Sequence, residues 1–260
     1  MKMKKIIIVS ILCIALMISS VSALAATTPI SVDAARENVQ KFVNTPLVQI
    51  QYQESKYLDL GDYYVFSTGN GQAYVNMYTG VVERASFTDA LESSGNIRLD
   101  SAQAKAIAGN YAEEKYPGFS DMNMQLTGSG LKNHGDSGSE YSFIWREKIK
   151  DALTPNMVVV NVNPDSGKVI SYIGIQREIT CSSEPGISRD NAIKIAEEQF
   201  PGIRVFDSST EQSIEYTKPG IQSLTWVITL KGEPDDHVLQ GGLVVIDALT
   251  GKVIVTAPYL

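Results

Sequence analysis

The chain has 260 residues, with 29 acidic against 22 basic side chains and a formal net charge of −7. Phosphate backbones and anionic lipid surfaces repel such a chain, which argues against nucleic acid and membrane surfaces as partners. A hydrophobic fraction of 43% is ample for buried cores.

The first 25 residues have the pattern of a secretory signal peptide. Three lysines precede an apolar run over residues 6–18, and Ala23-Leu24-Ala25 offers a cleavage site. We therefore expect a mature protein that is secreted or lies at the cell surface or envelope. The alternative is a retained membrane anchor. A lipoprotein is disfavoured because bulky residues precede Cys13, where lipid attachment requires small ones.

The first predicted module covers residues 26–87. Ser31 and Asp33 are typical of a helix start, and Pro46 ends the helix because proline lacks the amide that the next turn needs. Gly69-Asn70-Gly71 predicts a tight turn between the middle two of four strands. The strands are expected over residues 48–53, 63–67, 73–77 and 81–86. Residues 88–98 are polar and are predicted to be a linker.

The second predicted module covers residues 99–176. Its helix is expected over residues 101–116. Strands are expected over residues 122–127, 141–149, 157–162 and 168–175. Glycine and serine dominate residues 128–139, so we predict a mobile hairpin loop there. A second linker is expected over residues 177–186.

The third predicted module covers residues 187–260. Ser188 can cap a helix over residues 189–200, which Pro201-Gly202 ends. Strands are expected over residues 213–216, 223–230, 242–246 and 252–256. The chain's two tryptophans, Trp145 and Trp226, fall in equivalent strands of the second and third modules, where we expect them to anchor the cores.

Two short sequences occur twice at the same interval. Ala112-Glu-Glu-Lys-Tyr-Pro-Gly118 recurs as Ala196-Glu-Glu-Gln-Phe-Pro-Gly202, and Gly167-Lys-Val-Ile170 recurs as Gly251-Lys-Val-Ile254, in both cases 84 residues later. One interval shared by two unrelated motifs indicates duplication of a whole unit of helix plus sheet. We therefore predict an α+β fold of tandem modules, each with one helix packed on a small antiparallel sheet.

One turn pattern, Asn/Asp-x-x-Ser/Thr-Gly, precedes the last strand of each module. It occurs at residues 76–80, 163–167 and 247–251. The first side chain can accept a hydrogen bond from the amide two residues on, and glycine takes the positive φ that closes the hairpin. A calcium loop beginning at Asn161 is the alternative, but that loop needs Gly and Glu where the chain has Ser166 and Tyr172.

Residues that support catalysis are scarce. His134 and His237 are the only histidines, and no zinc-peptidase, nucleophile-elbow or phosphate-loop motif occurs. Asp235 and Asp236 together with His237 could hold a divalent metal, but we interpret them as a solvated loop. The sequence therefore predicts no catalytic residue, no metal site and no cofactor.

Two further features have structural interpretations. The glutamate pairs 113–114 and 197–198 are consecutive in their helices and point about 100° apart, so they face solvent rather than form an acid–base pair. Cys181 is the only thiol left after signal removal, so no intrachain disulfide is expected. We interpret Cys181 as a small buried or linker residue rather than a reactive thiol.

A capped helix that ends in Tyr/Phe-Pro-Gly, followed by strands and a closing Val-x-Val-Asn/Asp-x-x-Ser/Thr-Gly-Lys-Val, resembles the PepSY domain. The second and third modules match best, and the first is divergent. The resemblance implies a helix packed on an antiparallel sheet and a role in binding and restraining peptidases, as in the propeptides of thermolysin-like metallopeptidases. The family's signature positions are structural, so the resemblance implies no functional residue here.

These observations leave three hypotheses. The first is an exported, non-enzymatic protein-binding protein of PepSY type that inhibits or regulates a secreted or envelope peptidase. The second is a structural or scaffolding component of the cell envelope, and the third is an unrecognised hydrolase. The expected partner is a protein, with a membrane only if the N-terminal segment is retained. The sequence leaves the oligomeric state open.

Overall fold

The computed structural model describes residues 28–44, 49–58, 61–90, 96–218, 220–235 and 238–259. The predicted signal peptide over residues 1–25 lies outside the described residues, as do Asp236 and His237 of the candidate metal loop.

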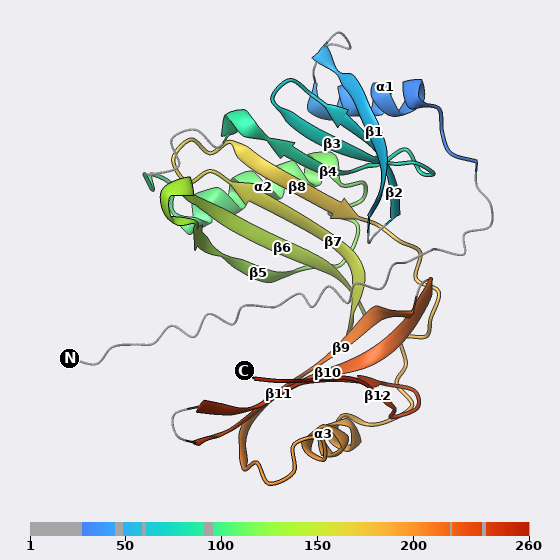
Figure 1. Ribbon diagram of the computed structural model, residues 1–260, viewed down its shortest axis with the longest axis vertical. Coiled ribbons are helices and arrows are strands. Elements are labelled where there is room, and N and C mark those ends of the chain that lie inside the picture. Colours follow the sequence, from blue (N-terminus) through green and yellow to red (C-terminus); the bar gives the residue numbers. More distant parts are fainter. Residues whose placement is uncertain are drawn as a thin grey trace.

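A helix followed by four strands occurs three times along the chain (Figure 1). The first group consists of α1 (Val32–Val43), β1 (Gln51–Leu58), β2 (Gly61–Ser67), β3 (Gly71–Asn76) and β4 (Val82–Phe87). The second group consists of α2 (Ser101–Lys115), β5 (Met124–Asn133), β6 (Ser139–Ile149), β7 (Ala152–Val162) and β8 (Val169–Ile175). The third group consists of α3 (Arg189–Glu197), β9 (Val205–Lys218), β10 (Ile221–Asp235), β11 (Val238–Asp247) and β12 (Val253–Pro258). Short 3-10 helices cover Thr88–Ala90 and Gly135–Ser137.

The strands of the three groups are hydrogen-bonded into one twelve-stranded sheet. β4 pairs with β8 antiparallel, and β7 pairs with β9 parallel through two residue pairs. The mixed α+β class is as predicted, but the small separate sheets expected from the sequence are joined edge to edge. In Figure 1, the first two groups form one continuous surface with α1 and α2 on the same face, and β9 to β12 with α3 form the lower part of the view.

Each helix begins at a capping side chain. Ser31 Oγ accepts from the Ala34 amide at 3.1 Å, and Ser188 Oγ accepts from the Asn191 amide at 3.3 Å. In α2 the cap is Asp100, which forms a capping box with Gln103. Small or β-branched residues four and eight positions after each cap are fully buried and let the helices approach the sheet closely. They are Ala35, Val39, Ala104, Ala108, Ala192 and Ala196.

The three predicted turns form as expected. The side-chain oxygen of Asn76 accepts from two amides at 3.0 Å, that of Asn163 at 2.8 and 3.0 Å, and that of Asp247 at 3.0 and 2.8 Å. The closing glycines all have positive φ, between 72° and 76°. These contacts engage the Asn163 side-chain oxygen in the turn. The described residues contain no group of three His, Cys, Asp or Glu side chains that could hold a metal.

Every turn also holds the helix of its own group. The residue before each cap donates its amide to a turn carbonyl: Ile30 to Met77 (2.8 Å), Leu99 to Pro164 (2.9 Å) and Ile187 to Ala248 (3.0 Å). The carbonyl of that same residue accepts from a buried aromatic side chain. The three donors are Tyr64 (2.9 Å), Tyr141 (3.1 Å) and Trp226 (3.2 Å). Helix and sheet are therefore joined by the same pair of hydrogen bonds in each group.

The two tryptophans lie in equivalent strands but not at equivalent positions. Both are in the second strand of their group, as expected. However, Trp226 pairs across the sheet with Ile246, just before the turn, whereas Trp145 pairs with Val158. Tyr141, which pairs with Val162, is therefore the residue at the position of Trp226. A hydrogen-bonding aromatic side chain is shared at this position, and an indole is not.

The predicted mobile loop over residues 128–139 is wrong for most of its length. β5 continues to Asn133 and β6 starts at Ser139, so only five residues lie between the paired strands. Strand pairing uses main-chain groups, which glycine supplies as well as any other residue. A bulge lies between Leu126 and Gly128, and the Ile144 side chain packs over Gly128. The strands of the third group are likewise longer than predicted.

The predicted linkers are tied to the groups that they connect. The Arg177 amide donates to Asn156 at 2.6 Å, and the Thr180 amide donates to Gln222 at 2.8 Å. In the other linker, Thr88 to Ala90 form a 3-10 turn, and Arg98 forms an ion pair with Asp165 at 2.7 Å.

A matched pair of glycine substitutions tests the turn. Gly167→Ala should lower the free energy of unfolding by about 1–3 kcal/mol, because φ is +72° and the added Cβ lies 3.1 Å from Ile107. Gly109→Ala lies inside α2 with open space around it, so it should raise stability by about 0.5–1 kcal/mol. Urea unfolding measures both. Equal effects of the two substitutions would contradict this role of the turn.

Candidate functional site

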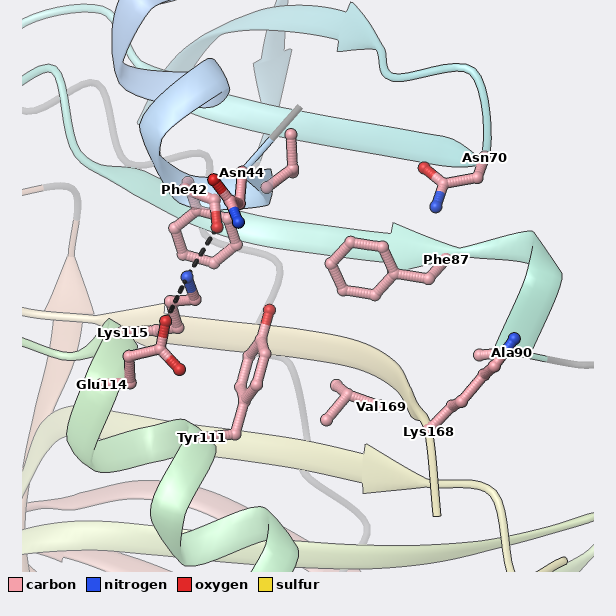
Figure 2. A pocket seen from close by; sticks show the side chains of 11 residues that line it. Phe42, Asn44, Asn70, Phe87, Ala90, Tyr111, Glu114, Lys115, Lys168 and Val169 are labelled. Carbon is pink, nitrogen blue, oxygen red and sulfur yellow. Dashed lines mark hydrogen bonds and ion pairs between the residues drawn. The ribbon is translucent and has the colours of Figure 1, made fainter. Parts of the chain in front are cut away.

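The strongest candidate for a binding site is a cleft between the C-terminal ends of α1 and α2 (Figure 2). Its volume is about 380 Å³. Its walls come from α1, α2, the β2–β3 turn, the end of β4 and the start of β8. Among its lining residues are Phe42, Phe87, Tyr111, Glu114, Lys115 and Val169.

Aromatic side chains from both helices form the floor of the cleft. The Phe42 ring packs edge-on against Tyr111, with 6.5 Å between the ring centres, and lies 5.3 Å from the ring centre of Tyr172 in β8. Phe42 and Tyr111 each lie eleven residues after the cap of their helix, so equivalent positions of the two groups meet here. Burial, and then the nearby charge of Glu114, raise the pKa of Tyr111 above its ordinary value of 10.0. The phenol is therefore neutral at physiological pH.

Lys115 supplies a charged group at the rim of the cleft. Its Nζ donates to the Phe42 carbonyl at 2.7 Å and forms an ion pair with Glu114 at 2.8 Å (Figure 2). The same ammonium lies 5.1 Å from the centre of the Phe42 ring. Lys115 thus caps the end of α1, and its charge is already paired. The cleft can receive an apolar side chain, and the lining residues that the structure describes include no nucleophile activated by a base.

A buried ion pair lies on the other face of the sheet. Glu83 of β4 is 2% exposed and accepts from both terminal nitrogens of Arg177, at 2.7 and 2.9 Å. Tyr63 Oη and Asn76 Nδ2 donate to the same carboxylate at 2.5 and 3.1 Å. Arg177 belongs to the predicted linker before the third group, so this cluster joins the first group to the other two. Both carboxylate oxygens are engaged, so the cluster fixes the orientation of the linker against the first group.

The residues singled out in the sequence do not come together. His134 lies at the exposed tip of the β5–β6 hairpin, 3.4 Å from Glu140. The glutamates at 113–114 and 197–198 are exposed, as expected, although α3 ends at Glu197 rather than at the predicted residue 200, so Glu198 lies just past it. Cys181 is half-buried against the third core, and burial raises the pKa of its thiol, which disfavours the reactive thiolate.

Neither the cleft nor the buried ion pair was predicted from the sequence. Glu83 sits in a short strand between Val82 and Arg84 that reads as an ordinary alternating strand. Arg177 lies 94 positions away in a segment that reads as a linker. The only local indication of the cleft was an aromatic residue near the end of each of the first two helices, Phe42 and Tyr111.

No helix among the described residues is both long and apolar enough to cross a membrane.

The comparisons with known proteins agree with the fold. Residues 186–254 match the family model described as "Peptidase propeptide and YPEB domain", which is the PepSY domain. Among solved structures, the Bacillus megaterium YpeB C-terminal domain superposes with a TM-score of 0.51 at 14% sequence identity. The match covers 89% of this chain and 99% of that one. No curated protein matches.

These matches show the domain type of the third group and the fold of the chain. The predicted PepSY resemblance is confirmed for residues 186–254, and nearly the whole chain shares its fold with the YpeB domain. Three tandem copies stay a prediction, since the family model matches the third group alone.

Removing the charge of Glu83 tests the buried ion pair. Glu83→Gln leaves the Arg177 cation buried without a counter-charge, so the free energy of unfolding should fall by about 3–5 kcal/mol. Asp33→Asn is the control, because Asp33 forms an exposed ion pair with Arg36 and its loss should cost about 0.5 kcal/mol or less. Denaturant unfolding of both variants measures the difference. A Glu83→Gln variant as stable as the control would show that the ion pair is dispensable.

The buried tyrosines make stability depend on alkaline pH. Burial, then the charge of Glu83 and its hydrogen bond, raise the pKa of Tyr63 above 10.0 in the folded protein. The unfolded chain therefore loses this proton first, and stability should fall as pH rises above about 10. Tyr63→Phe should make this fall shallower, although Tyr111, Tyr116 and Tyr172 share its direction. Unfolding curves between pH 8 and about 11 test the change in slope.

Proposed function

We propose that the chain is an exported, non-enzymatic protein-binding protein built of three PepSY-type modules, which regulates or inhibits a secreted or envelope peptidase. The observation that carries the proposal is the match of residues 186–254 to a family that is described by its occurrence in peptidase propeptides. The YpeB domain shares the fold over nearly the whole chain.

The repeated helix–turn contact supports the threefold arrangement. In each group, one amide and one carbonyl just before the helix cap bond to a turn and to an aromatic side chain of the second strand. Two hydrogen bonds at equivalent positions in all three groups are not expected if the groups are unrelated. The first two groups therefore have the same arrangement of helix, turn and second strand as the third, which matches the family model.

Binding rather than catalysis is supported by how the polar groups are used. The buried carboxylate of Glu83 is engaged by Arg177, Tyr63 and Asn76, and Lys115 is held by Phe42 and Glu114. The chain's acidic charge favours a partner with a cationic surface. The cleft between α1 and α2 is the first place to look for the contact.

An inhibition assay tests the proposal. Thermolysin and the peptidases exported by the same cell are titrated with the purified chain, up to about 10 μM. At least one should be bound and slowed, and Phe42→Ala should weaken the effect if the cleft carries it. Ile221→Ala, an exposed apolar residue far from the cleft in the fold, is the matched control. A chain that neither binds nor slows any of these peptidases overturns the inhibitory function.

A scaffolding role in the envelope is the second candidate. It is favoured by the polar contacts that join the second and third groups. The Arg146 side chain of β6 donates to Ser213 and Glu215 of β9 at 3.0 and 3.2 Å. Such contacts suit a rigid spacer. Cross-linking in native envelopes separates the two functions, because a spacer should capture abundant surface proteins and an inhibitor should capture a peptidase.

A further inference from the structure

Three strands of the described sheet pair on one side only: β1, β5 and β12. An unpaired strand edge is a template for another strand unless it is protected. Residues 51–54 of β1 are exposed and mainly polar, and β5 is bulged and contains two glycines and a lysine. β12 reads Val-Ile-Val-Thr-Ala-Pro, with its three aliphatic residues half-exposed. Over the residues whose side chains the structure describes, β12 is the least protected of the three edges.

The chain itself shows how such an edge is paired. β4 and β8 are the last strands of the first two groups, and they pair antiparallel with Ala85 opposite Tyr172. Both residues are the fourth of their strand, counted from Val82 and Val169. A bulge precedes them at the same place, since Val75 pairs with Val82 and Val162 pairs with Val169. The third residue of each strand pairs with the fifth of the other.

This pairing therefore joins equivalent strands about a local twofold axis. Two identical strands in the same register would form an isologous interface, as in a twofold symmetric dimer. β12 is the equivalent strand of the third group, because Ile246 pairs with Val253 after the same bulge. Its fourth residue is Thr256, and Thr256 is exposed.

The backbone of β12 presents the groups that this pairing needs. The Tyr259 amide donates to the Gly241 carbonyl of β11 at 3.0 Å. In an antiparallel ladder the direction of the amides alternates, so the amides of Ala257 and Val255 also point to β11. The amide and carbonyl of Thr256 therefore point outward. Pro258 also lies at an outward position, where its lack of an amide ends the ladder.

We propose that a second copy of this chain pairs with β12, antiparallel and with Thr256 opposite Thr256 on a twofold axis. The two central residues exchange both main-chain hydrogen bonds, and each Ile254 amide donates to the Pro258 carbonyl of the other copy. The dimer continues the sheet of one copy into the sheet of the other. It repeats between two chains the contact that β4 and β8 make within one.

The side chains at this seam indicate a reversible dimer. Phe42 and Tyr111, eleven residues after the caps of α1 and α2, cover the β4–β8 seam with aromatic rings. Counted from the cap Ser188, the eleventh residue of the third group is Gln199, two residues past the end of α3; it is half-buried and donates to the Ile195 carbonyl at 3.2 Å. A polar residue here stabilises the seam less than an aromatic pair would. We expect dissociation in the micromolar range, on the order of 1–100 μM.

The first experiment removes the outward amide. Thr256→Pro deletes the two central hydrogen bonds and leaves the bonds to β11 intact, so the chain should stay folded while dimer affinity falls by about tenfold or more. Thr256→Val is the matched control, because it keeps the amide and loses only the hydroxyl. Sedimentation velocity over a concentration series measures the affinity, and the melting temperature checks the fold.

The second experiment tests the register. Opposed residues of a hydrogen-bonded pair have Cα atoms about 5.5 Å apart, within disulfide reach. In a Cys181→Ser background, Thr256→Cys should therefore cross-link to itself on mild oxidation, and Val255→Cys should not. Gln199→Tyr should tighten the dimer by about threefold to tenfold, because it restores the aromatic pair of the first seam.

Three outcomes overturn the proposal. One is a chain that sediments as a monomer up to about 100 μM. Another is a dimer that Thr256→Pro leaves unchanged while the variant stays folded. The third is a dimer in which Val255→Cys cross-links as well as Thr256→Cys, because the contact would then lie in another register or elsewhere.

Discussion

The pair of hydrogen bonds between each helix start and its turn is the constraint on which the rest of the structure depends. The Leu99 amide reaches the Pro164 carbonyl, and the Leu99 carbonyl accepts from Tyr141. Because both bonds precede the first helical turn, they set where the helix enters the sheet and which face it covers. The closing glycine is required for the same reason, since Ile107 and Leu99 pack against it where a Cβ would lie. Equivalent helices then meet at equivalent residues, which produces the cleft between Phe42 and Tyr111.

The groups are held together by contacts of a different kind. Apolar burial dominates within each group, whereas the groups are joined by the β4–β8 and β7–β9 strand pairs, by aromatic contacts of Phe42 and by charged side chains. The Glu83–Arg177 pair is buried and its desolvation cost offsets much of its attraction, so its value lies in orientation more than in net stability. Its geometry permits one arrangement of the first group against the linker, because four donors converge on a single carboxylate. Binding at the cleft would therefore act on a sheet whose parts are already oriented.

Local features of the fold could be predicted because their causes are local. Ser31 and Ser188 cap helices whose start depends on a few neighbouring amides, and Asn163 and Gly167 close a turn by bonds within five residues. The Gly/Ser-rich stretch over residues 128–133 misled the prediction, because composition reports side chains while a ladder is made of main-chain groups. The cleft could not be predicted, since Phe42 and Lys115 are 73 positions apart and meet only when β4 and β8 pair.

The sequence by itself determined the repeated unit: its capped helix, its Asx turns with their glycines, its four strands and the PepSY resemblance of the third group. These features depend on contacts between residues close in the chain and on short sequence motifs. Tertiary structure alone decided that the strands form one sheet, that Tyr141 rather than Trp145 takes the position of Trp226, and that Glu83 meets Arg177. It also decided that, among the described residues, β12 pairs on one side only. Strand edges, register and buried ion pairs arise between distant segments, and no local pattern of residue types specifies which segments meet.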